Sequence, residues 1–191
     1  MINLKCFAIA IGFIIMQAMA GGVVKGTIHG SPKKIVNALI YIEEVNQTFA
    51  PPAKHAELDQ KNLLFQPHVL PVLKGTVVDF LNGDNVRHNV FSPSLEKYNL
   101  GTWPTGEIKS RTFDKTGVYV QLCNVHAEME GYVVVLQNPF FCLTKKDGLF
   151  EIKDVPPGTY VLKAWQEKLK KIQEQKIAVT DKKETNVNFT F

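Results

Sequence analysis

Apolar residues in this chain recur mainly at every second position, and this spacing constrains the fold more than any other feature of the sequence. It is clear in Val118–Leu122 and again in Val187–Phe191. Turn-forming residues interrupt the pattern at intervals of about ten positions, as in proteins made of many short strands. We therefore predict an all-β fold, sandwich or barrel, between Gly21 and Phe191.

The segment 165–176 fits both a helix pattern and a strand pattern. Trp165, Leu169 and Ile172 are spaced as on a helix among Lys, Glu and Gln. Strand-patterned runs flank the segment directly, so we expect strand, turn and strand over residues 165–176, with a helix as the alternative.

The N-terminus has the pattern of a secretory signal peptide. Lys5 precedes an uninterrupted apolar or small run from Cys6 to Met16, and Ala18-Met19-Ala20 has the small residues of a cleavage site. A run of about 11 residues is too short to cross a bilayer, which takes about 20. We predict that residues 1–20 are removed, that no membrane span remains, and that the mature protein is soluble and periplasmic or otherwise exported.

The charge balance argues against one class of partner, and the cysteine count raises the question of a disulfide. The chain has 22 basic and 18 acidic residues, and this excess is small and dispersed, which argues against a nucleic-acid partner. Of its 3 cysteines, Cys123 and Cys142 remain after removal of the signal peptide. In an oxidising compartment two such cysteines form a disulfide by default.

The mature chain has three parts. Residues 46–54, with Pro51-Pro52, have the composition of a linker, and Asn138-Pro139 marks the other side of the central segment. Only two strands, 23–28 and 38–45, precede the linker, and two strands cannot bury a core alone. We expect them to pair with strands of the C-terminal part.

Most of the candidate metal-ligating side chains lie in one short motif. Cys123, His126 and Met129 follow a predicted strand with the spacing Cys-x2-His-x2-Met, and His88 lies upstream in Arg-His-Asn-Val-Phe. Two imidazoles, a thiolate and a weak axial thioether are the ligands of a blue-copper electron-transfer site. Taken singly, each residue also has a purely structural interpretation. Cys123 could be half of a disulfide or a buried apolar residue. His88 could be a surface or core residue, and Met129 could be a core residue.

The central segment, over about residues 57–137, resembles the cupredoxins, and most closely the amicyanin and plastocyanin group. The matching stretches are 74–80, 82–84, 88–90, 117–119, 123–129 and 131–135. The resemblance implies a Greek-key β-sandwich with one type 1 copper ion held by His88, Cys123, His126 and Met129. It also implies that Asn89 ties the two ligand loops together, and that electrons enter and leave through an exposed His126.

The motif departs from the family in three places. Ala127 stands where amicyanin has proline. Gln121 shares the strand parity of Cys123 and should point inward, where the family has an apolar residue; it either hydrogen-bonds near the site or marks a bulge. Glu128 and Glu130 bracket Met129, and they either favour a basic patch on a partner or are merely solvated.

The flanking parts resemble the carboxypeptidase regulatory-like, prealbumin-type β-sandwich. The stretches that carry this resemblance are 26–28, 37–42, 147–152 and 155–162. We therefore predict a cupredoxin domain, 54–138, inserted into a second small sandwich split into 21–50 and 139–191. Bacterial exported proteins of the methylamine-utilisation or plastocyanin-like kind have a similar layout.

The leading functional hypothesis is a one-electron carrier that cycles copper between Cu(II) and Cu(I) with redox partner proteins, and not an enzyme. The alternative is a copper-binding protein for storage or delivery, because the same ligands bind Cu(I) tightly. A third class is a carbohydrate-binding or interaction protein, for which Trp103 and Trp165 are the aromatic candidates.

Three further predictions concern single residues. His68 is a weaker candidate as a ligand or as a group near the metal, and His29 and His55 are expected at the surface. Cys142 is expected to be reduced and buried as a small apolar residue, because pairing with Cys123 would destroy the metal site.

Overall fold

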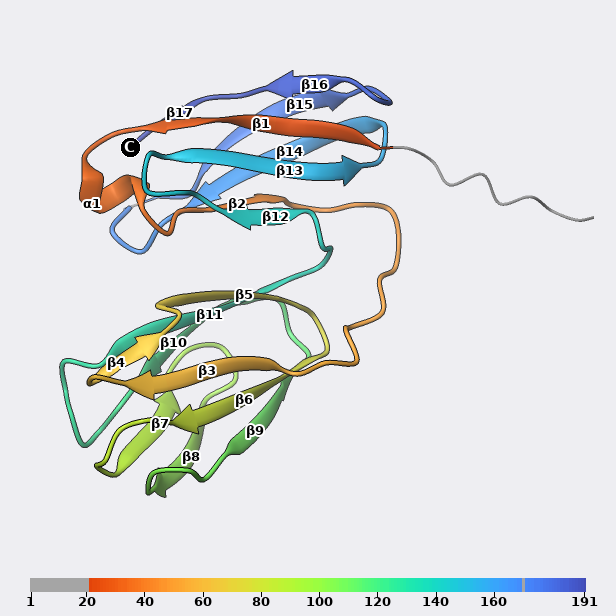
Figure 1. The fold of residues 1–191 in the computed structure, drawn as a ribbon. Helices are drawn as coiled ribbons and strands as arrows, with labels where there is room; N and C mark the ends of the chain where they lie inside the picture. Colours follow the sequence, from red (N-terminus) through yellow and green to blue (C-terminus); the bar gives the residue numbers. More distant parts are fainter. Residues whose placement is uncertain (1–20, 170) are drawn as a thin grey trace, which may run out of the picture.

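The protein is almost entirely β-structure, which confirms the predicted all-β sandwich fold (Figure 1). The computed structural model describes residues 21–169 and 171–191, so the predicted signal peptide, residues 1–20, lies outside the described residues. The elements are β1 (Gly22–His29), α1 (Pro32–Ile35), β2 (Leu39–Ile42), β3 (Ala56–Lys61), β4 (Leu64–Gln66), β5 (Val69–Leu73), β6 (Thr76–Asn82), β7 (His88–Ser92), β8 (Tyr98–Trp103), β9 (Lys109–Phe113), β10 (Gly117–Leu122), β11 (Glu130–Leu136), β12 (Phe141–Leu143), β13 (Leu149–Val155), β14 (Gly158–Trp165), β15 (Gln173–Val179), β16 (Glu184–Asn186) and β17 (Phe189–Thr190).

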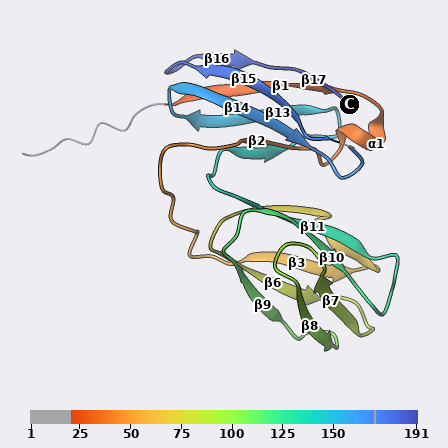
Figure 2. The ribbon, with the colours of Figure 1, turned by 180° about the vertical axis from the view of Figure 1, so that it is seen from behind.

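The strands of the described residues form four sheets, stacked as two sandwiches (Figures 1 and 2). In one sandwich, the sheet β13-β1-β16, with β17 also paired to β1, faces the sheet β12-β2-β14-β15. In the other, the sheet β5-β11-β10-β7-β8 faces the sheet β4-β3-β6-β9. We call the first the flanking sandwich and the second the central sandwich. The flanking sandwich combines strands from both ends of the described chain, as the scarcity of strands before the linker led us to expect.

Three apolar layers hold the stack together. The flanking sandwich is filled by side chains such as Ile40, Phe150 and Leu162, and the central sandwich by side chains such as Phe80 and Phe113. A third layer lies between the sandwiches, where the outer faces of β5, β10 and β11 meet those of β2, β12 and β14. Its members are Leu39, Val69, Tyr132, Val134 and Leu136, with Tyr41, Val118, Val120, Phe141, Leu143 and Trp165 packed against them.

Strand β11 shows how the sequence specifies this stack. From Gly131 to Leu136 every residue is buried. Val133 and Val135 face the central core, whereas Tyr132, Val134 and Leu136 face the layer between the sandwiches. A strand covered on both faces is apolar without alternation, which is why Tyr-Val-Val-Val-Leu breaks the period of two.

A polar contact joins the sandwiches beside this layer. His68, in the β4–β5 turn, lies with Nε2 2.8 Å from Oε2 of Glu167, in the turn after β14. The His68 ring also packs edge-on against Tyr132, with 5.5 Å between the ring centroids. His68 therefore has a structural partner of its own.

Two local predictions can be compared with the structure. Strand β14 ends at Trp165 and β15 begins at Gln173, so strand, turn and strand is confirmed, and the helix is wrong, for the described residues 165–169 and 171–176. The short helix α1 was not predicted, because its four residues give no periodicity to detect. Among the described residues, no helix has the length and apolar character needed to span a bilayer.

Candidate metal centre

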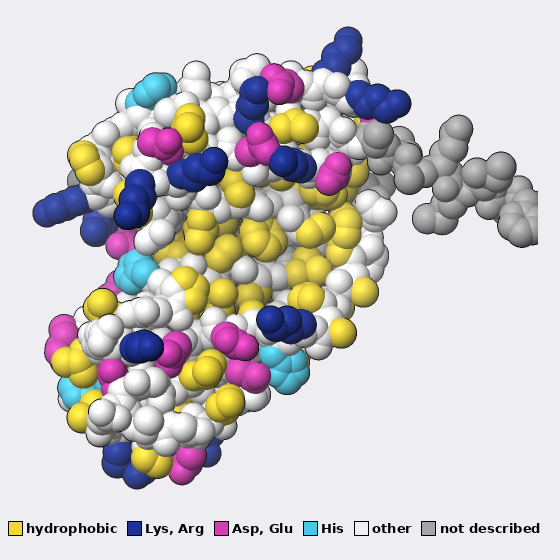
Figure 3. Space-filling view, in the orientation of Figure 1, with side chains coloured by type: hydrophobic (Ala, Val, Ile, Leu, Met, Phe, Trp, Pro, Cys, Tyr) yellow, Lys and Arg dark blue, Asp and Glu magenta, His cyan; other side chains and the backbone are white. Residues whose placement is uncertain are grey.

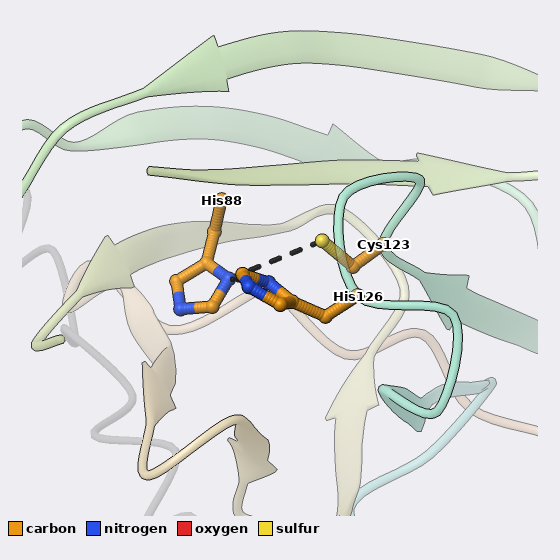
Figure 4. Close-up of side chains that lie close together, drawn as sticks. All are labelled: His88, Cys123 and His126. Carbon is orange, nitrogen blue, oxygen red and sulfur yellow. Dashed lines mark hydrogen bonds between the residues drawn. The ribbon is translucent and has the colours of Figure 1, made fainter. Parts of the chain in front are cut away.

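Three of the side chains predicted to bind a metal, those of His88, Cys123 and His126, lie close together in the central sandwich (Figure 4). His88 is the first residue of β7, and Cys123 directly follows β10. The pairing of Leu122 with Phe91 places these two strands side by side. The loop from Cys123 to Met129 connects β10 to β11. His88 and the loop residues, which are far apart in the sequence, therefore meet at the same end of the sheet.

Three donor atoms converge there. Nδ1 of His126 lies 3.1 Å from Nδ1 of His88, and Sγ of Cys123 lies 3.9 Å from the same His88 nitrogen. All three donor atoms lie within 4.8 Å of one another, close enough to share one metal ion. His88 and Cys123 are buried, whereas His126 is half-buried. Only the His126 side of the group therefore approaches solvent.

The far side of His88 is held by a carboxylate. Nε2 of His88 lies 2.9 Å from Oδ2 of Asp84. Because a carboxylate accepts a hydrogen bond, this contact places the ring proton on Nε2 and leaves the Nδ1 lone pair facing Cys123 and His126. The imidazole is thus oriented as a metal ligand requires.

Asp84 is itself fixed by the β3–β4 turn. Its carboxylate accepts hydrogen bonds from the backbone N–H groups of Asn62, at 2.6 Å, and Leu63, at 2.9 Å. Desolvation by burial opposes ionisation, but the hydrogen bonds from Leu63, His88 and Asn62 hold the pKa of Asp84 below its ordinary value. Sequence reasoning assigned no role to Asp84; an acidic residue four positions before His88 was the available signal.

Met129 ends the ligand loop inside the core. Its side chain is fully buried and belongs to the same apolar core as Cys123. The backbone N–H of Met129 donates to the carbonyl of His126 at 3.1 Å, which tightens the turn between them. Ala127 and Glu128, between these residues, are exposed.

Asn89 makes contacts on both sides of the site. Its backbone N–H points at Sγ of Cys123, 3.5 Å away, and its side-chain oxygen lies 3.4 Å from the backbone N–H of Asn124. Its side-chain nitrogen donates to Oδ1 of Asn99 at 2.8 Å and to the carbonyl of Gly101 at 2.7 Å. Asn89 therefore connects β7 with the ligand loop and with β8.

Gln121 points inward and is fully buried, as its strand parity predicted. Its side-chain oxygen accepts from the Tyr98 hydroxyl, and its side-chain nitrogen donates to the Tyr119 carbonyl at 3.0 Å. The register of β10 with β11 is continuous, so no bulge is needed to accommodate it. Both ends of this buried amide are satisfied, which is what permits a polar side chain in the core.

The remaining candidates lie outside the group. His68 contacts Glu167 and is not among the grouped residues, and His29 and His55 are exposed, which confirms their surface assignment. Cys142 is a free thiol, as expected, but it is half-buried and not fully buried. Burial raises the pKa of the Cys142 thiol to about 11.

The donor set fits copper. A thiolate is a soft ligand suited to Cu(I), and imidazole suits several transition metals, Cu(II) included. The 3.1 Å between the two Nδ1 atoms is close to the separation that two imidazoles reach when they share one ion at about 2.0–2.1 Å each. The inner side of the group is enclosed by buried residues of the central core.

Comparisons with known proteins give the following likenesses. The family described as polysaccharide lyase family 4, domain II, matches residues 126–187. No curated protein matches the chain.

Several solved structures are similar over about half of the chain. A Cu-containing nitrite reductase from Thermus scotoductus SA-01 is 26% identical at a TM-score of 0.43, and the match covers 51% of this chain and only 25% of the reductase. A purple cupredoxin from Nitrosopumilus maritimus is 26% identical at a TM-score of 0.39, covering 42% of this chain and 98% of the cupredoxin. A reduced Cu(I) form of an amicyanin mutant is 24% identical at a TM-score of 0.41, covering 52% and 98%. At such TM-scores these likenesses do not fix the function of this chain.

Proposed function

We propose that this protein is a type 1 copper protein that transfers single electrons between partner proteins. The observation that carries the proposal is the convergence of Nδ1 of His88, Nδ1 of His126 and Sγ of Cys123 within 4.8 Å of one another. Met129, buried in the same core, would supply the weak axial donor. The copper ion, once bound, supplies a single Cu(II)/Cu(I) redox step.

The protein residues hold the site rigid. Asp84 fixes the ring of His88, and Asn89 directs an N–H group at the Cys123 sulfur. A ligand set that is already positioned needs little rearrangement when the charge changes, and this lowers the barrier to electron transfer. Half-buried His126 is the ligand nearest solvent, so we propose it as the route for electrons.

We also propose the domain organisation, location and partner chemistry that the sequence predicts. Residues 54–138 would form a cupredoxin domain inserted into a split, prealbumin-like sandwich, 21–50 and 139–191, of an exported, periplasmic protein without substrate turnover. Glu128 and Glu130 are exposed beside the ligand loop. An acidic edge there favours a partner that presents a basic patch.

Copper titration of the purified protein tests the proposal. We expect one equivalent of Cu(II) to produce an intense blue charge-transfer band from the Cys123 thiolate. Cys123→Ser should abolish the band with the fold intact, and the matched change Cys142→Ser, in the flanking sandwich, should retain it. A colourless Cu(II) complex of the unchanged protein would contradict the assignment.

A second measurement separates electron transfer from copper storage or delivery. An electron carrier should cycle reversibly in an electrochemical scan and retain its ion in both states. Loss of Cu(I) to a copper-free acceptor on reduction, without reversible cycling, would favour delivery instead.

A further inference from the structure

An apolar groove runs along the junction of the two sandwiches, and no candidate metal ligand lines it. Figure 3 shows the hydrophobic side chains that gather in the hollow between the two sandwiches. The groove has a volume of about 410 Å³, which is within the range of small-molecule sites. Its walls include Phe49, Pro52, Ala56, Val72 and Phe141.

The walls come from the linker and from the edges of two sheets. Phe49 is held in place by Phe140, with 5.6 Å between ring centroids and an edge-on geometry. Ala50, next to it in the linker, is exposed and also lines the groove. Pro71 lies in β5, the edge strand on this side, and proline has no N–H to offer an added strand. The groove therefore suits an apolar chain better than a β-strand of a partner or of a second copy.

One polar group in the groove has no partner. Thr76 lines it, the residue is 2% exposed, and within the described residues its hydroxyl makes no hydrogen bond. A buried hydroxyl left unpaired is costly. The Thr76 oxygen itself has almost no accessible surface, so a bound chain would cover the residue without hydrogen-bonding to it.

The groove continues into a charged end. A second hollow of about 460 Å³ shares Pro52 and Ala56 with it and is lined by Lys54, His55 and Glu57. His55 is hydrogen-bonded through Nδ1 to Asp79 at 3.0 Å. Lys54 and Glu57 are exposed, and neither forms an ion pair within the described part of the chain. This end therefore presents one available charge of each sign.

We propose that the groove binds a single-chain lipid with a zwitterionic headgroup of the phosphocholine kind. The alkyl chain would lie against Phe49 and Val72. The phosphate would face Lys54 and the ammonium group Glu57. This proposal does not depend on the metal site.

Titration calorimetry with dodecylphosphocholine below its micelle-forming concentration tests the proposal. We expect saturable binding, and we expect dodecyl maltoside, which has the same chain and an uncharged head, to bind about two- to fivefold more weakly, the range of an exposed ion pair. Phosphocholine without a chain should not bind. Equal affinity for the two detergents, or no saturable binding of either, would overturn the proposal.

Matched variants locate the site. Ala50→Trp fills the groove and should weaken binding about tenfold, because it displaces two or so methylene groups. Ala53→Trp, in the same linker but outside the groove, should leave affinity unchanged. The opposite result, with Ala53→Trp weakening binding and Ala50→Trp not, would place the lipid elsewhere and contradict the proposal.

Two further variants test the groove wall and the headgroup. Thr76→Val should raise the thermal midpoint of the lipid-free protein and leave lipid binding unchanged, because it removes an unpaired hydroxyl that the lipid does not reach. Lys54→Glu should weaken dodecylphosphocholine and leave dodecyl maltoside unchanged. If both detergents weaken equally with Lys54→Glu, the headgroup assignment is wrong. Circular dichroism and the thermal midpoint serve as the controls for folding in every variant.

Discussion

The two sandwiches of this protein are built from similar sheets but differ in what they bury. Among its described residues, the flanking sandwich buries few polar side chains, such as Thr144 and Gln166, which directly follow β12 and β14. The central sandwich buries more of them, among them Gln60, Asn82, His88, Asn89 and Gln121. Burying a polar group costs free energy unless the group is hydrogen-bonded. Buried polar groups therefore concentrate where they have a structural or functional role. The difference locates chemistry in one sandwich and structural support in the other.

The cysteines repeat this contrast. Cys123 lies beside two imidazoles and the N–H of Asn89, whereas Cys142 lies at the border of an apolar core with its pKa raised by burial. The same residue type is thus a candidate metal ligand in one sandwich and filling in the other. The following predictions test how far this separation holds.

The largest expected effect is on stability. Phe150→Ala, in the flanking core, should lower the free energy of unfolding by about 3–5 kcal/mol. The blue band should persist at room temperature, because Phe150 belongs to the flanking core and not to the core that contains Cys123 and Met129. Phe113→Ala, the matched change in the central core, should cost a similar amount and also perturb the band. Loss of the band in folded Phe150→Ala would show that the two sandwiches act as one unit.

Removing the carboxylate behind His88 should weaken metal binding. We expect Asp84→Ala to reduce copper affinity about 10–100-fold, because the imidazole loses the partner that fixes its orientation. Asp79→Ala, which removes an aspartate of β6 that pairs with His55 instead, is the control. Unchanged affinity in Asp84→Ala would mean that packing alone orients His88.

The Tyr98–Gln121 hydrogen bond can be tested as a pair. Gln121→Leu and Tyr98→Phe should each cost about 1–3 kcal/mol, because the first leaves the half-buried Tyr98 hydroxyl unpaired and the second leaves the side-chain oxygen of fully buried Gln121 unpaired. The double variant should cost less than the sum of the two, by about 1 kcal/mol, as for directly coupled residues. Chemical denaturation of the four proteins measures this, and simple additivity would show that the bond stabilises nothing.

Substitution of the proposed axial ligand, Met129, should change the reduction potential more than the blue absorption band. Met129→Leu should retain the blue band and raise the reduction potential by about 50 mV, the equivalent of roughly 1 kcal/mol for one electron. Cyclic voltammetry measures the shift. A colourless variant, or a lowered potential, would contradict the weak axial role of Met129.

The smallest effect concerns thiol reactivity. With a pKa of about 11, Cys142 has about one thousandth of its thiol ionised at pH 8, so alkylation should be very slow. Mass spectrometry of peptides after iodoacetamide treatment reads each cysteine separately. Rapid modification of Cys142 in the folded protein would show that this end of the flanking sandwich opens.

Much of this architecture could be predicted from the sequence because the signals are local. Alternation specifies strands, and the unbroken apolar run of Gly131–Leu136 specifies a strand covered on both faces. The loop Cys123–Met129 carries three candidate ligands within seven positions, and His88 matches the same family pattern. These features depend on spacing, which a sequence shows directly.

The contacts that could not be predicted depend on how distant segments dock. Asp84 reaches His88 only because the β3–β4 turn fixes its carboxylate through Asn62 and Leu63. His68 and Glu167, 99 positions apart, meet because the two sandwiches pack through Tyr132 and Trp165. Outward-facing aromatic residues indicate that a surface is covered, but they do not indicate by what.

The most direct test of the metal centre is X-ray absorption at the copper edge of the loaded protein, which identifies the atoms bound to the ion. We predict two imidazole nitrogens and one short copper–sulfur bond in the unchanged protein. That bond should be absent from Cys123→Ser and present in Cys142→Ser. A copper ion bound only by nitrogen and oxygen in the unchanged protein would contradict the assignment of His88, Cys123 and His126 as the metal site.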